Sequence, residues 1–311
     1  MSKPTVLLVD DEERILRSLR MLFFTGYNVR ITTDAHEAIR ILREERVHVI
    51  VSDQRMPIML GAELLGIARE TSPATMRILL TGYSDLEASI ASVNDGEVFR
   101  YLLKPWNAEE VKHVVAEAAA IAEASFAAQE SFEALINKPD PQNVCVLVMD
   151  DDESTAHAVR EILQHQAEVI WAKNVQDAME ILALQDVAVV VTDLILDGKN
   201  VSYVLKTVKH LNPKTQSIVV TSFNDTSSLI DLINQAQIAR YLPKPLRKNL
   251  LERNLKYLIE RFHALSSLPV LQNRQSVAPI NDPQEKVRSG NFMDLLSRLR
   301  ANRMPVAEQR P

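Results

Sequence analysis

Short apolar runs alternate along the chain with stretches in which apolar residues recur every three or four positions. In the first part of the chain the apolar runs are Thr5–Val9, Asn28–Thr32, Val47–Ser52, Met76–Leu80 and Val98–Leu103. The stretches between them, such as Glu12–Phe24 and Asp34–Arg46, carry their apolar residues at helical spacing. Continuous apolar strands that alternate with amphipathic helices predict an α/β fold with a parallel sheet covered on both faces. We therefore expect a doubly wound (βα)5 domain whose five strands follow the flavodoxin-like order.

The same pattern occurs a second time, 140 positions further along the chain. The segment VLLVDDEE begins at Val6 and VLVMDDDE begins at Val146, and Asp53 and Asp193 each follow a run of apolar residues. A repeat kept in one register over this length predicts two copies of one domain. We place the first copy at residues 4–122, a helical connector and linker at 123–143, the second copy at 144–265 and a tail at 266–311.

The connector and the tail differ from the two copies. The segment Asn107–Ile136 is rich in Ala and Glu and lacks Gly and Pro, which favours one long helix running out of the first copy. We expect a flexible tail with one short amphipathic helix at Ser289–Met304, capped by Asn291. Its apolar stripe comprises Phe292, Leu295, Leu296 and Leu299. This helix could fold back on the second copy or dock into the groove of a partner, and both alternatives stay open.

Composition narrows the class of protein. The 311 residues are 46% hydrophobic and 24% charged, as in ordinary globular proteins. No apolar run approaches the roughly 18 residues of a membrane span, so no membrane association is expected. The one cysteine, Cys145, lies in a predicted strand and cannot form an internal disulfide, which fits a cytoplasmic protein. The net charge is −6, and both copies are acidic whereas the tail is weakly basic, which argues against a broad nucleic-acid surface.

Polar residues follow the strands of the first copy where the chain leaves the sheet. Because the carboxyl ends of parallel strands share one edge, we expect these side chains to converge. Carboxylates that gather there repel one another unless a cation compensates, and carboxylate ligands suit Mg²⁺. With a lysine and a threonine beside them, the group has the equipment to bind a phosphoryl group, and Asp53 is the natural acceptor. The converging residues are Asp10, Asp11, Asp53, Thr81 and Lys104, and those of the second copy are Asp150, Asp151, Asp193, Thr221 and Lys244.

These residues resemble the receiver domain of bacterial two-component response regulators. The resemblance rests on LLVDDE at Leu7–Glu12, SDQRMPIMLG at Ser52–Gly61, LLTGY at Leu79–Tyr83 and RYLLKPW at Arg100–Trp106. It covers residues 4 to about 120 and again about 144 to 262. The motif sequences of the first copy are most similar to those of receivers attached to cyclic-di-GMP phosphodiesterase or hydrogenase-regulator output domains.

The resemblance implies a role for each matching residue of the first copy. Asp53 would accept a phosphoryl group from a sensor histidine kinase or a phosphotransfer protein. Asp10, Asp11, Asp53 and the backbone carbonyl of Arg55 would hold Mg²⁺.

The remaining residues would bind the phosphoryl group and report its presence. Lys104 would contact the phosphoryl oxygens from a cis Lys104–Pro105 junction. Thr81 would move toward the phosphoryl group and let Tyr101 turn inward, and the alternative is that Tyr101 is simply a half-buried strand residue. In the second copy the matching residues are Asp193 as acceptor, Asp150, Asp151 and the Ile195 carbonyl at the metal, Lys244, Thr221 and Tyr241. There LILDG follows Asp193 in place of QRMP, so the loop geometry should differ.

The expected function is that of a phosphorelay response regulator that signals through phosphorylation-dependent contact with a downstream protein. A homodimer is one alternative for its assembly. The 46 residues beyond the second copy are too few for a conventional DNA-binding or enzymatic output domain, so we expect no enzymatic activity beyond self-phosphorylation and autodephosphorylation. Alternatives are a phosphate sink or relay intermediate, or a scaffold with one receiver that is not phosphorylated. An aspartyl-phosphate phosphatase is a distant alternative. That class requires a second acid two residues after its nucleophile, and this chain has Arg55 and Ile195 at those positions.

Overall fold

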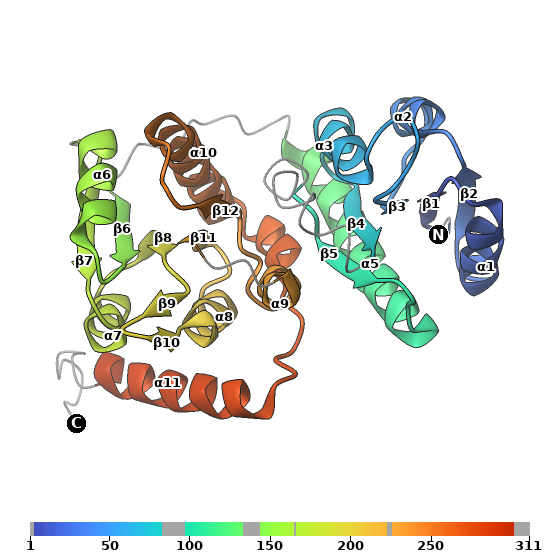
Figure 1. The fold of residues 1–311 in the computed structure, drawn as a ribbon. Helices are drawn as coiled ribbons and strands as arrows, with labels where there is room; N and C mark the ends of the chain where they lie inside the picture. The colour runs from blue at the N-terminus through green and yellow to red at the C-terminus, as the bar shows by residue number, and fades with distance from the viewer. Residues whose placement is uncertain (1–2, 83–96, 133–143, 165, 223–225, 302–311) are drawn as a thin grey trace, which may run out of the picture. The chain divides into compact units, whose positions relative to one another are not determined.

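The chain folds into two compact units, one around each copy (Figure 1). The structure is a computed structural model that describes residues 3–82, 97–132, 144–164, 166–222 and 226–301. The end of the predicted connector helix, most of the linker and the residues beyond 301 lie outside this range. None of the described helices combines the length and apolar content that a membrane span requires.

The first copy is a doubly wound parallel sheet, as the hydrophobic pattern predicts. Its strands lie in the order β2-β1-β3-β4-β5, which is the flavodoxin-like order. The strands are β1 (Thr5–Val9), β2 (Asn28–Thr32), β3 (Val49–Asp53), β4 (Met76–Thr81) and β5 (Arg100–Leu103). The described helices are α1 (Glu13–Phe23), α2 (Ala35–Glu44), α3 (Gly61–Thr71) and α5 (Ala108–Phe132).

The second copy repeats this topology, with strand order β7-β6-β8-β11-β12. The agreement extends to single hydrogen bonds, since the hydroxyls of Ser52 and Thr192 each donate to the carbonyl of the following aspartate. The strands are β6 (Val144–Met149), β7 (Ala167–Ala172), β8 (Val187–Thr192), β11 (Gln216–Thr221) and β12 (Arg240–Pro243). The helices are α6 (Glu153–Leu163), α7 (Val175–Leu184), α8 (Ser202–Leu211), α9 (Thr226–Ala236) and α10 (Lys248–Ser267). The prediction of tandem copies is therefore confirmed.

The central strands of each sheet are buried on both faces. In the first copy Leu16 and Phe23 of α1 and Val115 of α5 pack with β-strand residues such as Val6 and Val51 into one apolar cluster. Helices α2 and α3 lie against each other and against β1 and β3. Burial of both faces leaves the strand ends as the place where polar side chains can gather without a cost in core packing.

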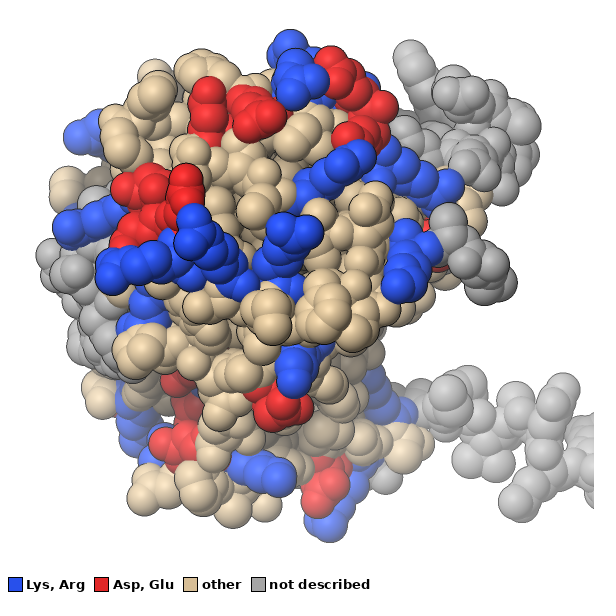
Figure 2. Space-filling view, turned by 90° about the vertical axis from the view of Figure 1, so that its right-hand side faces the viewer, with Lys and Arg blue, Asp and Glu red and all other residues tan. Residues whose placement is uncertain are grey.

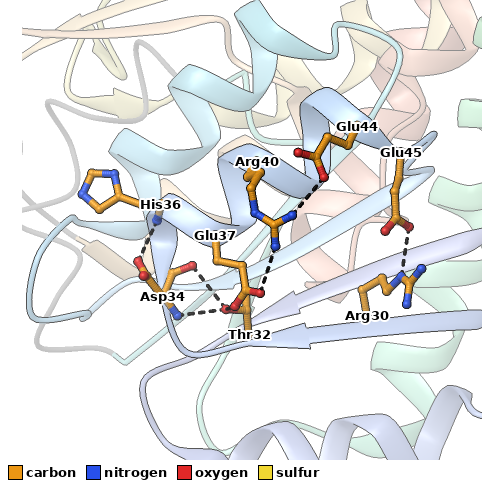
Figure 3. A network of polar contacts seen from close by, with 8 residues as sticks. All are labelled: Arg30, Thr32, Asp34, His36, Glu37, Arg40, Glu44 and Glu45. Carbon is orange, nitrogen blue, oxygen red and sulfur yellow. Dashed lines mark hydrogen bonds and ion pairs between the residues drawn. The ribbon is translucent and has the colours of Figure 1, made fainter.

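The entry to α2 shows how local chemistry sets an element boundary (Figure 3). The carboxylate of Asp34 accepts the backbone N–H of His36 and caps the helix, as the pattern D-x-x-E favours. The Thr32 hydroxyl, at the end of β2, donates to Glu37 over 2.6 Å, and Arg40 bridges Glu37 and Glu44. The exposed ion pairs each contribute at most about 1 kcal/mol, so the cap and the buried face define the helix.

The tail is more ordered than expected, and its helix begins earlier. Helix α11 spans Pro283–Ala301, and the Asp282 carboxylate accepts the backbone N–H groups of Gln284 and Glu285. The predicted cap at Asn291 is therefore wrong. An aspartate followed by proline is a strong start signal for a helix, because the side chain satisfies free N–H groups and proline needs none.

Helix α11 packs on α7 and α8, which is the fold-back alternative. Of the predicted stripe, Phe292 and Leu296 are buried, whereas Leu295 is exposed. The Glu285 carboxylate accepts hydrogen bonds from the Ser202 hydroxyl and from the ammonium of Lys206, whose side chain is only 3% exposed.

We predict that Glu285→Ala lowers the free energy of unfolding of the second unit by about 3–5 kcal/mol, because it leaves the buried Lys206 ammonium without its counter-ion. Urea unfolding followed by Trp171 fluorescence in a Trp106→Phe chain measures this. The control Glu252→Ala removes a carboxylate from a half-exposed pair with Lys256 and should cost less than about 1 kcal/mol. Equal effects of the two substitutions would contradict the prediction.

Candidate functional site

The polar residues of the first copy do converge at the carboxyl ends of its strands. Asp10 follows β1, Asp53 ends β3 and Lys104 follows β5. The Lys104 ammonium lies 2.9 Å from Asp10 Oδ2 and 2.6 Å from Asp53 Oδ1, so one cation bridges both carboxylates. The Lys104–Pro105 bond is cis, as the resemblance implies.

The three acids of the first copy form a group that fits a divalent cation. Ligand oxygens of Asp10, Asp11 and Asp53 all lie within 4.8 Å of one another. Asp10 and Asp53 are buried, whereas Asp11 is exposed and opens the group to solvent. Carboxylate oxygens around a partly open position are what Mg²⁺ binds while keeping several waters. The Arg55 N–H donates to Asp53 Oδ2 over 2.9 Å, and the role of its carbonyl stays a prediction.

The charge balance follows from burial. Burial raises the pKa of Asp10, which the hydrogen bonds from Lys104 and the Glu12 N–H only partly offset. Burial also acts to lower the pKa of Lys104, but the two carboxylates outweigh it and the net shift is upward. Lys104 therefore keeps its charge, and a cation placed among these oxygens relieves the energetic cost of the buried carboxylates.

Thr81 and Tyr101 flank this group on β4 and β5. The Thr81 hydroxyl donates to the Gly82 carbonyl over 3.3 Å rather than to Asp53. Tyr101 is 2% exposed, and burial raises the pKa of its hydroxyl. Tyr101 thus occupies a buried position, while the switch role of both residues stays a prediction.

Gly61, at the first turn of α3, is a site residue that sequence reasoning missed. A Cβ at this position would lie 1.9 Å from the carbonyl oxygen of Asp53 and 2.8 Å from its carbonyl carbon. Only glycine lets the helix approach the acceptor strand this closely. The signal was present, because Gly61 closes the quoted motif SDQRMPIMLG.

The second copy repeats the bridge. The Lys244 ammonium lies 3.1 Å from Asp150 Oδ2 and 2.7 Å from Asp193 Oδ2, and the Lys244–Pro245 bond is cis. Burial acts to raise the pKa of Asp193, but hydrogen bonds from Lys244, Thr221 and the Ile195 N–H outweigh it, and the net shift is downward. Burial, followed by the Asp193 carboxylate, raises the pKa of Tyr241.

The surroundings of the second group differ from those of the first. The Thr155 hydroxyl donates to Asp150 Oδ2 over 2.7 Å, and the Trp171 indole N–H donates to the Asp150 carbonyl over 2.7 Å. Within the described part of the chain, Asp150, Asp151 and Asp193 do not form a group as compact as the first. The hydrophobic periodicity of the sequence does not predict either hydrogen bond, because each depends on the position of a single side chain.

The loop after Asp193 also takes another form. The LILDG segment folds into a hairpin of β9 (Ile195–Leu196) and β10 (Lys199–Asn200). Its turn residues Asp197 and Gly198 have φ values of 51° and 69°, the left-handed conformation that Asp-Gly turns adopt. The expected change of loop geometry is therefore confirmed, and the Asp-Gly pair was its sequence signal.

Cys145 and the surface charges bear on other functions. Burial, with Glu168 and Asp186, raises the pKa of the Cys145 thiol to about 11, which suits a packing residue rather than a nucleophile. Figure 2 shows a face on which Lys and Arg side chains are interspersed with Asp and Glu instead of forming one continuous basic field.

Comparison with known proteins identifies the fold family. The family model of the response regulator receiver domain matches residues 6–116 and 146–256. The hydrogenase transcriptional regulatory protein HoxA of Cupriavidus necator is 40% identical over 114 residues, which are 37% of this chain and 24% of that protein. The DNA-binding transcriptional regulator NtrC of Proteus hauseri is 34% identical over 119 residues, 38% of this chain and 25% of that protein. The chain thus spans about a quarter of the length of these curated relatives.

Solved structures include similar chains. The signal receiver domain of an HD domain-containing protein from Pseudomonas fluorescens is 34% identical and aligns over 42% of this chain and 94% of its own, with a TM-score of 0.38.

We predict that Gly61→Ala destabilises the first copy by about 1–3 kcal/mol, because the new methyl group forces the Asp53 backbone or α3 to shift. Urea unfolding followed by Trp106 fluorescence in a Trp171→Phe chain measures the effect. The matched control is Gly26→Ala, where a Cβ meets nothing within 4 Å and stability should change by less than about 0.5 kcal/mol. An unchanged midpoint for Gly61→Ala would show that the close approach to Asp53 is unimportant.

Proposed function

The chain belongs to the response regulator receiver family, and we propose that it accepts a phosphoryl group on Asp53, and also on Asp193, and signals by phosphorylation-dependent contact with a downstream protein. The donor would be a sensor histidine kinase or a phosphotransfer protein. Receivers of this family interact with such donors, and the specific donor and target of this chain are part of the proposal.

The lysine bridge is the observation that carries the proposal. In each copy one ammonium contacts both the acceptor carboxylate and the buried aspartate after the first strand. A lysine in that position can neutralise a phosphoryl group attached to the acceptor, since phosphoryl transfer depends mainly on positioning and charge neutralisation.

The transfer itself needs few protein groups. A carboxylate oxygen of Asp53 attacks phosphorus, the new O–P bond forms as the P–N bond to the donor imidazole breaks, and the imidazole leaves neutral once protonated. Mg²⁺ held by the aspartates would supply charge neutralisation when bound. Lys104 moves its hydrogen bonds from the carboxylates to the phosphoryl oxygens, and the Thr81 hydroxyl turns from the Gly82 carbonyl toward them.

A change at the strand ends can alter the surface of the last elements of a copy. Thr81 and Tyr101 lie on the neighbouring strands β4 and β5, whose register pairs Leu79 with Tyr101 and Thr81 with Leu103. Movement of Thr81 toward the phosphoryl group would change the packing next to the buried Tyr101.

A second possibility is that one copy acts as a scaffold without being phosphorylated. The different hydrogen bonds of Asp150 and the hairpin after Asp193 favour it, because the second site departs from the first while keeping the acceptor.

We predict that incubation with acetyl phosphate, at a Mg²⁺ concentration well above the one that saturates the first copy, adds up to two phosphoryl groups to the intact chain, with one site lost in Asp53→Asn and the other in Asp193→Asn. Intact-mass spectrometry measures the number of groups. The double substitution is the control for modification elsewhere and should remain unmodified. If the wild-type chain gains nothing under conditions that label an established receiver, the proposed phosphoacceptor function is wrong.

A further inference from the structure

The two copies differ in what holds the first aspartate of the acid group. In the first copy Asp10 Oδ1 accepts the Glu12 N–H over 2.9 Å and Asp10 Oδ2 accepts the Lys104 ammonium over 2.9 Å. These are its side-chain hydrogen bonds within the part of the chain that the structure describes. A carboxylate offers about four lone-pair positions, so Asp10 retains capacity for a cation.

Asp150 has the same two hydrogen bonds and one more. The Asp152 N–H and the Lys244 ammonium correspond to those of the first copy. In addition the hydroxyl of Thr155, which is 4% exposed, donates to Oδ2 over 2.7 Å. The position that matches Thr155 in the first copy is Ile15, whose side chain packs against the apolar core and offers no donor.

The acceptor aspartates also differ in their hydrogen bonds, and again the one in the second copy accepts more. Asp193 accepts hydrogen bonds from the Lys244 ammonium, the Ile195 N–H and the Thr221 hydroxyl. In the first copy the matching hydroxyl of Thr81 donates instead to a backbone carbonyl. Two hydroxyls of the second copy thus donate to carboxylates, whereas their counterparts in the first copy do not.

The position of the oxygens agrees with these hydrogen bonds. Ligand oxygens of Asp10, Asp11 and Asp53 lie within 4.8 Å of one another, and among the described residues Asp150, Asp151 and Asp193 do not meet this spacing. Because Mg²⁺ needs near-octahedral oxygens at about 2.1 Å, it demands that its ligands gather closely. A carboxylate that its own chain holds apart from the others must shift, and so weaken those hydrogen bonds, before its oxygens can join the group.

We propose that the first copy binds Mg²⁺ and that the second copy, in which Thr155 and Thr221 hold the carboxylates, does not bind it at concentrations that saturate the first. Thr155 is the residue that sets this difference. The choice of Mg²⁺ rests on the proposed function, whereas the difference between the two acid groups rests on the hydrogen bonds alone.

Each copy carries a tryptophan that can report on its own site. Trp106 lies two residues after Lys104, and the Trp171 indole donates to the Asp150 carbonyl. Full-length chains with Trp171→Phe or Trp106→Phe therefore report separately on the first and second copies. We expect Mg²⁺ to change Trp106 emission with saturation, to leave Trp171 emission unchanged over the same range, and to bind at one equivalent per chain in calorimetry.

Matched substitutions assign the binding site. Asp11→Asn should weaken Mg²⁺ binding at least about tenfold, whereas Asp151→Asn, its counterpart 140 positions later, should leave the binding isotherm unchanged. A response of Trp171 at the concentrations that affect Trp106, or weaker binding in Asp151→Asn, would overturn the proposal.

A reciprocal exchange tests Thr155 itself. Thr155→Ile should add a second binding event, and Ile15→Thr should weaken the first by about tenfold, with circular dichroism verifying the fold of both chains. If Thr155→Ile adds no second event, Thr155 does not set the difference. These results are independent of phosphorylation, so a chain that binds Mg²⁺ as expected and takes no phosphoryl group would contradict only the proposed function.

Discussion

The bridge from one lysine to two buried aspartates is the constraint on which each copy depends. Asp10 and Asp53 lie on adjacent strands, and a pair of buried carboxylates would repel without a cation between them. Lys104 reaches them from β5, which is separated from β3 by β4. Strands lie about 4.8 Å apart, so roughly 10 Å separate β5 from β3. The long Lys104 side chain and the Asp53 side chain cover this distance together. The strand order and the residue type are therefore linked, and both recur in the second copy.

Much of this arrangement is predictable from the sequence because it depends on the spacing of apolar residues along strands and helices. Apolar runs identify buried strands, helical stripes identify their covering helices, and a parallel sheet then brings Asp53, Thr81 and Lys104 to one edge. The repeat adds independent support, since each residue is found twice in one register. What the pattern could not predict are contacts made by single side chains. In the sequence, nothing distinguishes Thr155 from other helix residues. Its hydrogen bond to Asp150 is seen only in the structure.

The loops that follow the two acceptor aspartates differ in conformation although the sheets around them have the same topology. In the first copy the Gly61 N–H donates to the Gln54 carbonyl, and in the second the Val201 N–H donates to the Leu194 carbonyl, at matching positions. Both loops therefore have the same length and are closed by the same hydrogen bond. At the closing position the first copy needs a glycine, Gly61, beside the Asp53 carbonyl, whereas the second copy has the buried Val201. Between the closing residues the second copy forms a hairpin. The closing hydrogen bond keeps the acceptor in place while the loop interior changes.

A buried charge and its partner also make α11 a part of the second unit. Two lysines of α8 are buried, Lys206 beside Glu285 of α11 and Lys209 against the carbonyl of Thr215 and the side chain of Gln275. Burial lowers the pKa of Lys209 well below its ordinary value. The first copy has Gly66 at the position of Lys206 and so requires no counter-ion there. A buried ammonium without a partner costs several kcal/mol, so the lysine in α8 is tolerated only together with the segment that carries Glu285. The tail was expected to be flexible because it begins with a polar, proline-broken stretch. Its helix is held in part by the Lys206–Glu285 charge pair, which a hydrophobic pattern does not predict.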